Sequence, residues 1–409
     1  MKILCFGSCN IDFVYSVEKI LQPGQTIAAN DLSLFPGGKG LNQAIALAKA
    51  GAKVHFAGCI GPDGQMLRQV LESAGVELQY LRQVEEKTGH AIIQVDQTAE
   101  NAIMIFAGAN GCVTKEYIDT VLADFDRDEV LLIQNEISNL PYLVKKAGNK
   151  GMRIFFNPSP LNEQARKVDL DQIYCLLVNE TEAQTITDSR EPEALQGYIK
   201  ELYPHLQILL TQGKRGSVFI DRQQMIRQSA YRVDSVDTTA AGDAYAGYFL
   251  AGLCRGDSVK AAMDRASAAS AIAVTRNGAS ASIPTADEVD LQLPSMLPSL
   301  DPVDNRMTLV DEFLKEHYAD GTLQQLADLL GYTATYTGSW LKANLGATFT
   351  QLLQKKKCQV CAELLSSTDL PVSQIIHQVG CTNESFFRNK FRKEYGCTPL
   401  TYRKKMRCK

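Results

Sequence analysis

The chain has 409 residues, of which 45% are hydrophobic and 22% are charged, and its formal net charge is −4. This length allows one large α/β domain and one small helical domain. No apolar run approaches a membrane span, and Met1-Lys2-Ile3-Leu4 indicates a strand rather than an export signal. With no such signal, the 11 cysteines favour a reducing cytoplasm, so we expect a cytoplasmic protein without a membrane partner.

Short apolar runs separated by helical stretches predict the strands of a doubly wound α/β sheet. They cover residues 2–6, 54–57, 130–133, 153–156, 175–178 and 208–210. Alternating apolar and polar residues near 26–35 and 90–106 predict extra strands on one edge of that sheet.

A glycine-rich segment, Pro36-Gly37-Gly38-Lys39-Gly40-Leu41-Asn42-Gln43, leads into a strong helical pattern that ends at Gly51. Glycines let the backbone approach a small ligand closely. Asn42 is either a helix cap or a ligand of a hydroxyl group. Lys39 does not belong to a Walker-type phosphate loop, because the GxxxxGK[ST] pattern is missing.

A second segment, Asp237-Thr238-Thr239-Ala240-Ala241-Gly242-Asp243, precedes another helical pattern. Small residues at a helix start leave backbone N–H groups open to an anion such as phosphate. Asp243 then stands where it could accept a proton from a hydroxyl group that attacks a bound phosphoryl group. The alternative is an ordinary N-cap followed by a small-residue helix.

These two segments, in this order, resemble the signature motifs of the PfkB/ribokinase family of carbohydrate kinases. The resemblance extends from residue 1 to about residue 290 and is of the ribokinase type. Further matches occur in the family's order: Gly7-Ser8-Cys9-Asn10-Ile11-Asp12 at the end of the first strand, Ala107-Gly108-Ala109-Asn110, Asn157-Pro158-Ser159-Pro160, Asn179-Glu180-Thr181-Glu182 and Thr211-Gln212-Gly213-Lys214-Arg215-Gly216.

The resemblance implies a ribokinase-like fold with a small β lid, which in this family covers the sugar and forms the usual dimer contact. It assigns a sugar pocket to Asn10, Asp12, Gly38, Lys39, Asn42 and Glu136. It makes Asp243 the catalytic base, also in contact with the sugar, and Ala240, Ala241 and Gly242 the anion hole. Short carboxylates and amides suit a pentose, whose hydroxyl groups both donate and accept. Asp12 could instead be a turn residue after a strand.

The resemblance also implies ATP, Mg²⁺ and K⁺. Nucleotide-binding positions are Asn179, Glu182, Thr211, Gly213, Gly216 and Gly242, with Glu182 on the magnesium side. Glu182 could instead be a solvated helix charge. The monovalent cation site would use Asp237, Thr239, Gly278 and Ser282, and such oxygen ligands suit hard cations.

The chain continues beyond such a kinase. Residues containing Pro294, Pro298 and Pro302 predict an extended linker. Residues 306–409 hold 15 Lys and Arg against 9 Asp and Glu, a net charge of +6 that leaves −10 for the rest of the chain. We therefore expect a kinase domain at 1–293, a linker at 294–307 and a basic domain at 308–409.

The basic domain contains two helix-turn-helix patterns joined by a long helix over 348–365. Both copies resemble the DNA-binding domain of the AraC/XylS transcription regulators. In the second copy, one polar helix face for double-stranded DNA carries Ser385, Arg388, Asn389 and Arg392. The first copy departs from the family, because Gly338 lies inside its recognition helix and Ser339 stands where Arg is frequent. In the second, Cys381 replaces a usual aromatic residue.

The sequence therefore predicts an ATP-dependent sugar kinase fused to a DNA-binding module and paired as a homodimer. The expected reaction converts D-ribose to D-ribose 5-phosphate. The alternative is a transcription regulator whose kinase-like domain only senses a sugar or sugar phosphate. Retention of Asp243, the anion-hole residues and the cation-site residues favours catalysis, because a pure sensor needs no base.

Overall fold

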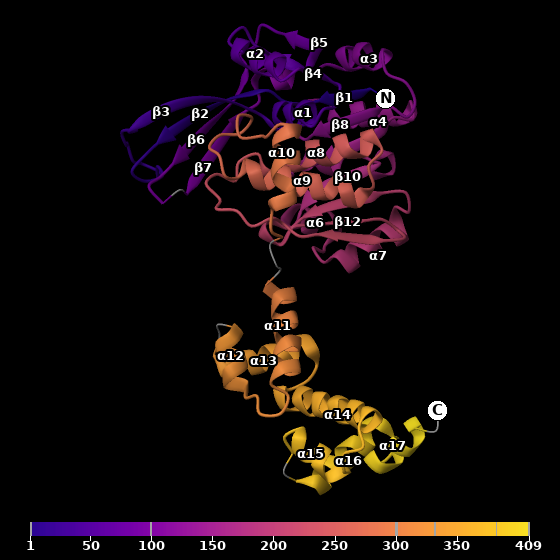
Figure 1. The fold of residues 1–409 in the computed structure, drawn as a ribbon. Coiled ribbons are helices and arrows are strands. Elements are labelled where there is room, and N and C mark those ends of the chain that lie inside the picture. The colour runs from indigo at the N-terminus through magenta and orange to yellow at the C-terminus, as the bar shows by residue number, and fades with distance from the viewer. Residues whose placement is uncertain (1, 99, 299–301, 331–332, 382, 408–409) are drawn as a thin grey trace. The chain divides into compact units, whose positions relative to one another are not determined.

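The computed structural model describes residues 2–98, 100–298, 302–330, 333–381 and 383–407 (Figure 1). The chain divides into two compact units, residues 1–299 and 300–409. No helix among the described residues is long and apolar enough to cross a membrane.

The first unit is built on a nine-stranded sheet with the order β13-β12-β11-β10-β9-β8-β1-β4-β5. All six apolar runs form strands of this sheet, most of them slightly longer than expected. Neighbouring strands from β5 to β11 run parallel, and β12 and β13 add antiparallel to β11. The strands are β1 (Ile3–Phe6), β4 (Val54–Ile60), β5 (Glu77–Gln83), β8 (Val130–Gln134), β9 (Arg153–Asn157), β10 (Cys175–Asn179), β11 (Gln207–Thr211), β12 (Ser217–Ile220) and β13 (Met225–Gln228).

Helices cover both faces of the large sheet, as the doubly wound prediction requires. Alternate strand residues point to opposite faces: Ile3 and Cys5 enter one core, and Leu4 and Phe6 enter the other. The first core packs under α1 (Lys39–Lys49), α2 (Gln65–Ser73), α8 (Ala241–Arg255), α9 (Val259–Ala273) and α10 (Ala286–Gln292). The second packs under α3 (Lys115–Ala123), α4 (Leu140–Asn149), α5 (Glu163–Arg166), α6 (Glu180–Thr187) and α7 (Pro192–Leu202).

The alternating segments form a sheet of their own and do not extend an edge of the large sheet. Its order is β3-β2-β6-β7, with β2 (Asn10–Ser16), β3 (Asp31–Gly37), β6 (Gly89–Val95) and β7 (Asn101–Phe106). The segment after β1 is therefore a strand, so Asp12 is not a turn residue. The lid sheet is separate from the large sheet because β2 pairs with β3 on one side and β6 on the other, so no edge of β2 is left to pair with the large sheet.

The second unit is all helical. Its helices are α11 (Pro302–Glu316), α12 (Leu323–Leu330), α13 (Ala334–Leu345), α14 (Phe349–Ser367), α15 (Val372–Gln378), α16 (Glu384–Tyr395) and α17 (Pro399–Arg407). The doubled pattern and the long helix between its copies are confirmed. The glycine expected to end α12, Gly331, lies outside the described residues.

Parts of the segment expected to be an extended linker, 294–307, are folded, and residues 299–301 lie outside the described residues. Leu293–Ser295 form a 3₁₀ turn, Pro298 pairs with Tyr231 of the first unit, and α11 begins at Pro302. Proline suits the first turn of a helix, where no hydrogen bond to an earlier carbonyl is required. The proline spacing therefore did not distinguish a linker from a helix start.

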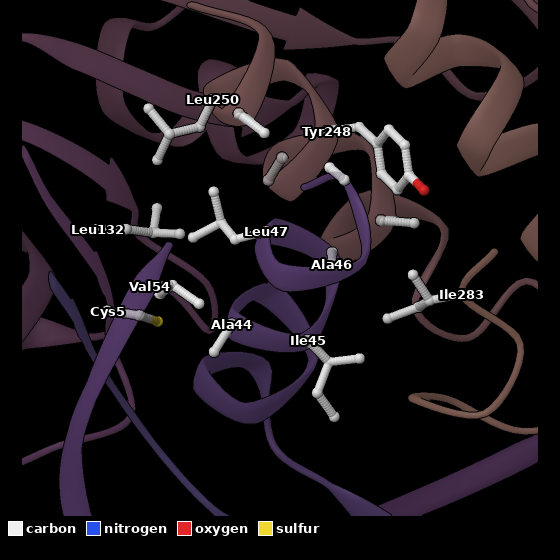
Figure 2. Packing of buried hydrophobic residues seen from close by; sticks show 14 of the residues in the cluster. Cys5, Ala44, Ile45, Ala46, Leu47, Val54, Leu132, Tyr248, Leu250 and Ile283 are labelled. Atoms are coloured by element: carbon white, nitrogen blue, oxygen red, sulfur yellow. The ribbon is translucent and has the colours of Figure 1, made fainter. Parts of the chain in front are cut away.

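Helices α1 and α8 approach each other through small residues. Figure 2 shows Ala44, Ala46 and Leu47 of α1 in the same buried cluster as Tyr248 and Leu250 of α8. At Gly247, an added Cβ would lie 2.3 Å from the Cβ of Ala46 and 2.9 Å from backbone atoms of α1. The contact thus depends on a residue without a side chain.

We expect Gly247→Ala to lower the free energy of unfolding by about 1–3 kcal/mol, because the two helices must move apart. Gly197→Ala is the matched control, since that helical glycine has no neighbouring atom within 4 Å of an added Cβ. The control should gain roughly 0.5–1 kcal/mol. Chemical denaturation of the purified variants measures both, and equal stabilities would contradict the close packing.

Candidate functional site

Asp243 lies in the first turn of α8 and is 6% exposed. The helix has Ala240 as its N-cap, with a φ of 65° and no side-chain hydrogen bond to the helix. The ordinary capping explanation therefore fails, because neither an Asp nor a Thr side chain closes this helix end. The N–H of Ala241 donates to Thr238 O at 3.2 Å, which leaves the N–H groups of Gly242 and Asp243 to attract an anion beside the buried carboxylate.

Both carboxylate oxygens of Asp243 accept hydrogen bonds from α1. Asn42 Nδ2 donates to Oδ2 at 3.0 Å, and Gln43 Nε2 donates to Oδ1 at 2.9 Å. Asn42 is therefore not a helix cap, because α1 has Gly38 as its N-cap and the Asn42 side chain reaches across to α8. Two donors fix the plane of the carboxylate, and each oxygen still has a free lone pair.

Two glutamines that the sequence analysis left without a role support this arrangement. Gln134, at the end of β8, donates from Nε2 to Gln43 Oε1 at 2.6 Å, so the amide group of Gln43 faces Asp243 as a donor. Both glutamines are fully buried. Gln43 follows Asn42 in the glycine-rich segment and could have been suspected; nothing local marked Gln134.

Glu136 and Lys39 form the charged part of the predicted sugar pocket. Glu136 Oε2 accepts from the Lys39 backbone N–H at 3.1 Å and from the Ser8 hydroxyl. Burial raises the pKa of Glu136, partly opposed by the hydrogen bond from Ser8. The negative charge of Asp243 is the largest cause that raises the pKa of Lys39, so its ammonium group stays charged.

The lid supplies Asn10 and Asp12 from the start of β2. Asn110 Nδ2 donates to Asn10 Oδ1 at 2.8 Å, which orients the Asn10 amide. Asp12 packs against the glycine-rich segment, since a Cβ on Gly37 would lie 2.1 Å from its Oδ2. Burial and then the charge of Glu136 raise the pKa of Asp12 to about 7. Asp12 of the lid thus lies near Glu136 in the turn after β8 and against the glycine-rich segment that leads into α1.

Two adjoining cavities lie beside Asp243. The larger, about 560 Å³, is lined among others by Thr211, Gly213, Gly216 and Gly242. The smaller, about 210 Å³, is lined among others by Lys39, Asn179, Glu182, Ala240 and Asp243. Gly242, Thr211, Thr238 and Tyr245 line both. The predicted nucleotide residues are therefore gathered on one side of Asp243.

Asn179 and Glu182 form a reciprocal capping box at the start of α6. Asn179 Oδ1 accepts from the Glu182 N–H at 2.9 Å, and Glu182 Oε2 accepts from the Asn179 N–H at 3.0 Å. Glu182 is thus not a freely solvated helix charge, because this box fixes its carboxylate at the wall of the smaller cavity.

The predicted cation-site residues lie on two loops linked by Asp237. Its carboxylate accepts from the backbone N–H groups of Thr239 at 2.9 Å and Gly278 at 3.0 Å, and these bonds lower its pKa against the opposing effect of burial. Ser282 donates to Ala279 O at 2.8 Å within the second loop. Among the described residues, no group of three or more His, Cys, Asp or Glu could hold a metal ion.

In the second unit, α16 presents the predicted DNA-contacting face. Ser385, Asn389 and Arg392 are exposed, whereas Phe387 and Phe391 are fully buried. Arg388 is half-buried and forms an ion pair with Glu384 at 3.0 Å, four residues earlier. The division into a packed face and a polar face is therefore as expected.

Comparison with known proteins agrees with both units. Residues 1–286 match the pfkB family carbohydrate kinase model, and residues 326–405 match the helix-turn-helix domain model. The ribokinase of Haemophilus influenzae is 33% identical over 69% of this chain and 95% of its own length. The deoxyribokinase of Salmonella typhimurium is 30% identical over 70% of this chain and 97% of its own. The crystal structure of ribokinase from Cryptococcus neoformans in complex with ADP is 33% identical, with a TM-score of 0.64 over 71% of this chain and 99% of that one.

Asp243→Asn should lower turnover about 10²–10⁴-fold, because it removes a proton acceptor. Sugar affinity, measured by calorimetry, should change only a few-fold, since the side chain keeps its shape. The exposed Asp287 supplies the control Asp287→Asn, which should leave turnover unchanged. Near-normal turnover of Asp243→Asn would rule out its role as base.

Sugar binding should depend on pH through Asp12. An ionised carboxylate accepts more hydroxyl hydrogen bonds than a neutral one, so KM for the sugar should fall up to about tenfold between pH 6 and pH 8. The folding stability of the empty enzyme changes in the unfavourable direction over a lower pH range. Because the pKa of Asp12 is raised on folding, its ionisation lowers the free energy of unfolding as pH rises from about 4 to 7. Asp12→Asn should abolish the pH dependence of KM, and an unchanged dependence would contradict this assignment.

Proposed function

Because this chain belongs to the pfkB family of carbohydrate kinases, we propose that it transfers the γ-phosphoryl group of ATP to the terminal hydroxyl group of D-ribose and forms D-ribose 5-phosphate. The observation that carries the proposal is the buried Asp243 carboxylate, held by Asn42 and Gln43 between the predicted sugar residues and the two cavities. Relatives named ribokinase support ribose, and the relative named deoxyribokinase makes 2-deoxyribose the first competitor.

In the proposed reaction, amide and carboxylate groups from the lid, from α1 and from Glu136 in the turn after β8 bind the sugar hydroxyls. Asp243 accepts the proton of the attacking hydroxyl group, and the N–H groups of Gly242 and Asp243 in the first turn of α8 stabilise charge on the transferring phosphoryl group. The N–H of Ala241 already donates to Thr238 O at 3.2 Å. Lys39 supplies a positive charge beside Asp243. Phosphoryl transfer requires positioning and charge compensation more than a strong base, and this arrangement provides both.

The residues present fit both proposed metal ions. Mg²⁺ needs only one or two carboxylates besides nucleotide phosphates, and Glu182 lies at the cavity wall for this role. K⁺ would lie among Asp237, Thr239, Gly278 and Ser282 and neighbouring carbonyls. Mg²⁺ would compensate phosphate charge, and K⁺ would order the loop before α8.

We also propose that two copies pair through the lid. Large apolar side chains are exposed on its two outer strands: Leu32, Leu34 and Phe35 on β3, and Ile103, Met104, Ile105 and Phe106 on β7. Such a concentration on a small sheet favours burial against a second copy.

The second unit then binds double-stranded DNA through α16 and links the sugar kinase to transcription. Its basic composition and the AraC-type helix-turn-helix match support this role. Lid-mediated pairing would bring two such modules together on paired half-sites.

A panel of pentoses and hexoses, assayed for ADP formation with sodium, potassium or a large organic cation, tests the kinase proposal. Ribose should give the highest kcat/KM, and potassium should raise kcat by ordering the loop that precedes α8. Equal rates in all three cations would contradict the cation site. Binding of ribose without turnover of any sugar would instead establish the sensor function.

DNA binding should weaken steeply as salt rises, because the basic unit displaces counterions from phosphates. The DNA target is first selected from random double-stranded DNA with the unaltered protein. If the Arg388 side chain contacts a base, Arg388→Ala should weaken binding to this target by about 1–3 kcal/mol and weaken binding to random DNA less. Lys404→Ala, a change at an exposed basic residue, is the control for loss of charge alone. Equal losses of Arg388→Ala on both DNAs would make Arg388 a phosphate contact.

A further inference from the structure

The helix-turn-helix unit contains two hydrophobic cores that share the helix α14. The first core includes Phe313, Leu326, Trp340 and Phe349, and the second includes Cys361, Leu365, Ile375, Phe387 and Phe391. Phe349 lies near the start of α14, and Cys361 and Leu365 lie nearer its end. Each half is thus stabilised by its own apolar side chains, and contacts at the junction add to the shared helix in holding one half against the other.

Lys357 of α14 makes such a contact. The residue is only 6% exposed, and its Nζ donates to Ala319 O at 3.0 Å and to Gly380 O at 2.8 Å. Ala319 belongs to the loop before α12 in the first half, and Gly380 to the turn before α16 in the second. The ion pairs found among the described residues do not include Lys357. A buried ammonium group is costly unless it is hydrogen-bonded, so these carbonyls hold it in place.

Both carbonyls lie near the C-terminal ends of helices, where a cation is favourable. Ala319 follows α11, whose end is marked by the bond from Gly321 N–H to His317 O at 2.8 Å. Gly380 follows α15, with its N–H donating to His377 O at 2.9 Å. The negative ends of two helix dipoles therefore face one ammonium group. The helix ends and the cation stabilise each other across the junction.

The two halves also touch directly at this point. Gly380 has a φ of 74°, and a Cβ on it would lie 2.1 Å from Ala319 O. Tyr318, next in the same loop, packs against the second core. The loop of the first half is thus seated on the turn that leads into α16, the predicted recognition helix.

From these contacts we propose that Lys357 is a positioning residue that holds the two helix-turn-helix halves at one separation, so that the module binds two major-groove segments of double-stranded DNA at a single spacing. The proposal rests on the DNA-binding function proposed above.

The test uses the full chain and a target selected from random double-stranded DNA with the unaltered protein. Affinity is then measured for this target and for a copy with one base pair inserted between its two protected segments. The unaltered protein should prefer the original spacing by roughly tenfold or more. Lys357→Met should reduce the preference to less than about threefold, and Lys357→Arg should restore it, because both carbonyls again receive donors. Lys355→Met, at an exposed position of the same helix, should keep the preference.

Gly380→Ala is a second variant that disturbs the junction without removing the cation. Gly396→Ala is its matched control: Gly396 ends α16 with a φ of 70°, and an added Cβ there has no neighbour within 4 Å. Gly380→Ala should lose the spacing preference, and Gly396→Ala should keep it.

If Lys357→Met and Gly380→Ala weaken binding to both DNAs equally, the junction serves only stability and the proposal is overturned. A selected target on which each chain protects one groove segment also overturns it. Failure to select any DNA would overturn the DNA-binding function itself and the positioning role with it.

Discussion

The contact between the start of α1 and the first turn of α8 organises the proposed kinase site around Asp243. Asn42 and Gln43 donate to the two oxygens of Asp243, which lies 201 and 200 residues later in the chain. Close packing at Ala46 and Gly247 keeps the helix axes near enough for these bonds. Gln134 extends the support to β8, an interior strand of the sheet. A carboxylate held on both oxygens loses little freedom when substrate arrives, which favours an oriented proton acceptor.

Charge balance is the second constraint on this site. Asp243, Glu136 and Glu182 place three carboxylates near one ammonium group, that of Lys39, and Asp12 lies near Glu136. Burial raises the pKa values of Asp12 and Glu136, while the carboxylates raise that of Lys39. Such a site is best satisfied by a ligand rich in hydroxyl groups, because each hydroxyl can donate to a carboxylate oxygen. Nucleotide phosphates would occupy the opposite side, where the open end of α8 provides N–H groups.

The second unit is organised differently, around a helix that belongs to two small cores. Neither core is large, and buried apolar area is the main source of stability for so small a unit. Polar contacts at the junction then contribute to the relative position of the two halves as well as to the stability of the unit. Lys357 shows how a buried cation can be accommodated without a carboxylate, by facing carbonyl groups at two helix ends.

The sequence by itself determined the features that depend on neighbouring residues. The core strands, the glycine-rich turn, the start of α8 with Asp243 and the two-faced helix α16 are all encoded in local periodicity and short motifs. The capping box of Asn179 and Glu182 is also local and could have been predicted from its three-residue spacing.

Only the tertiary structure decided which distant groups meet. The separation of the lid into its own sheet depends on the partners of β2, which apolar alternation does not specify. The roles of Gln134 and Lys357 were hidden for the same reason: one looks like an ordinary strand end, and the other like part of an exposed Lys355-Lys356-Lys357 run. Their hydrogen-bond partners lie 91, 38 and 23 residues away in sequence, so no local pattern carries the information that burial and folding supply.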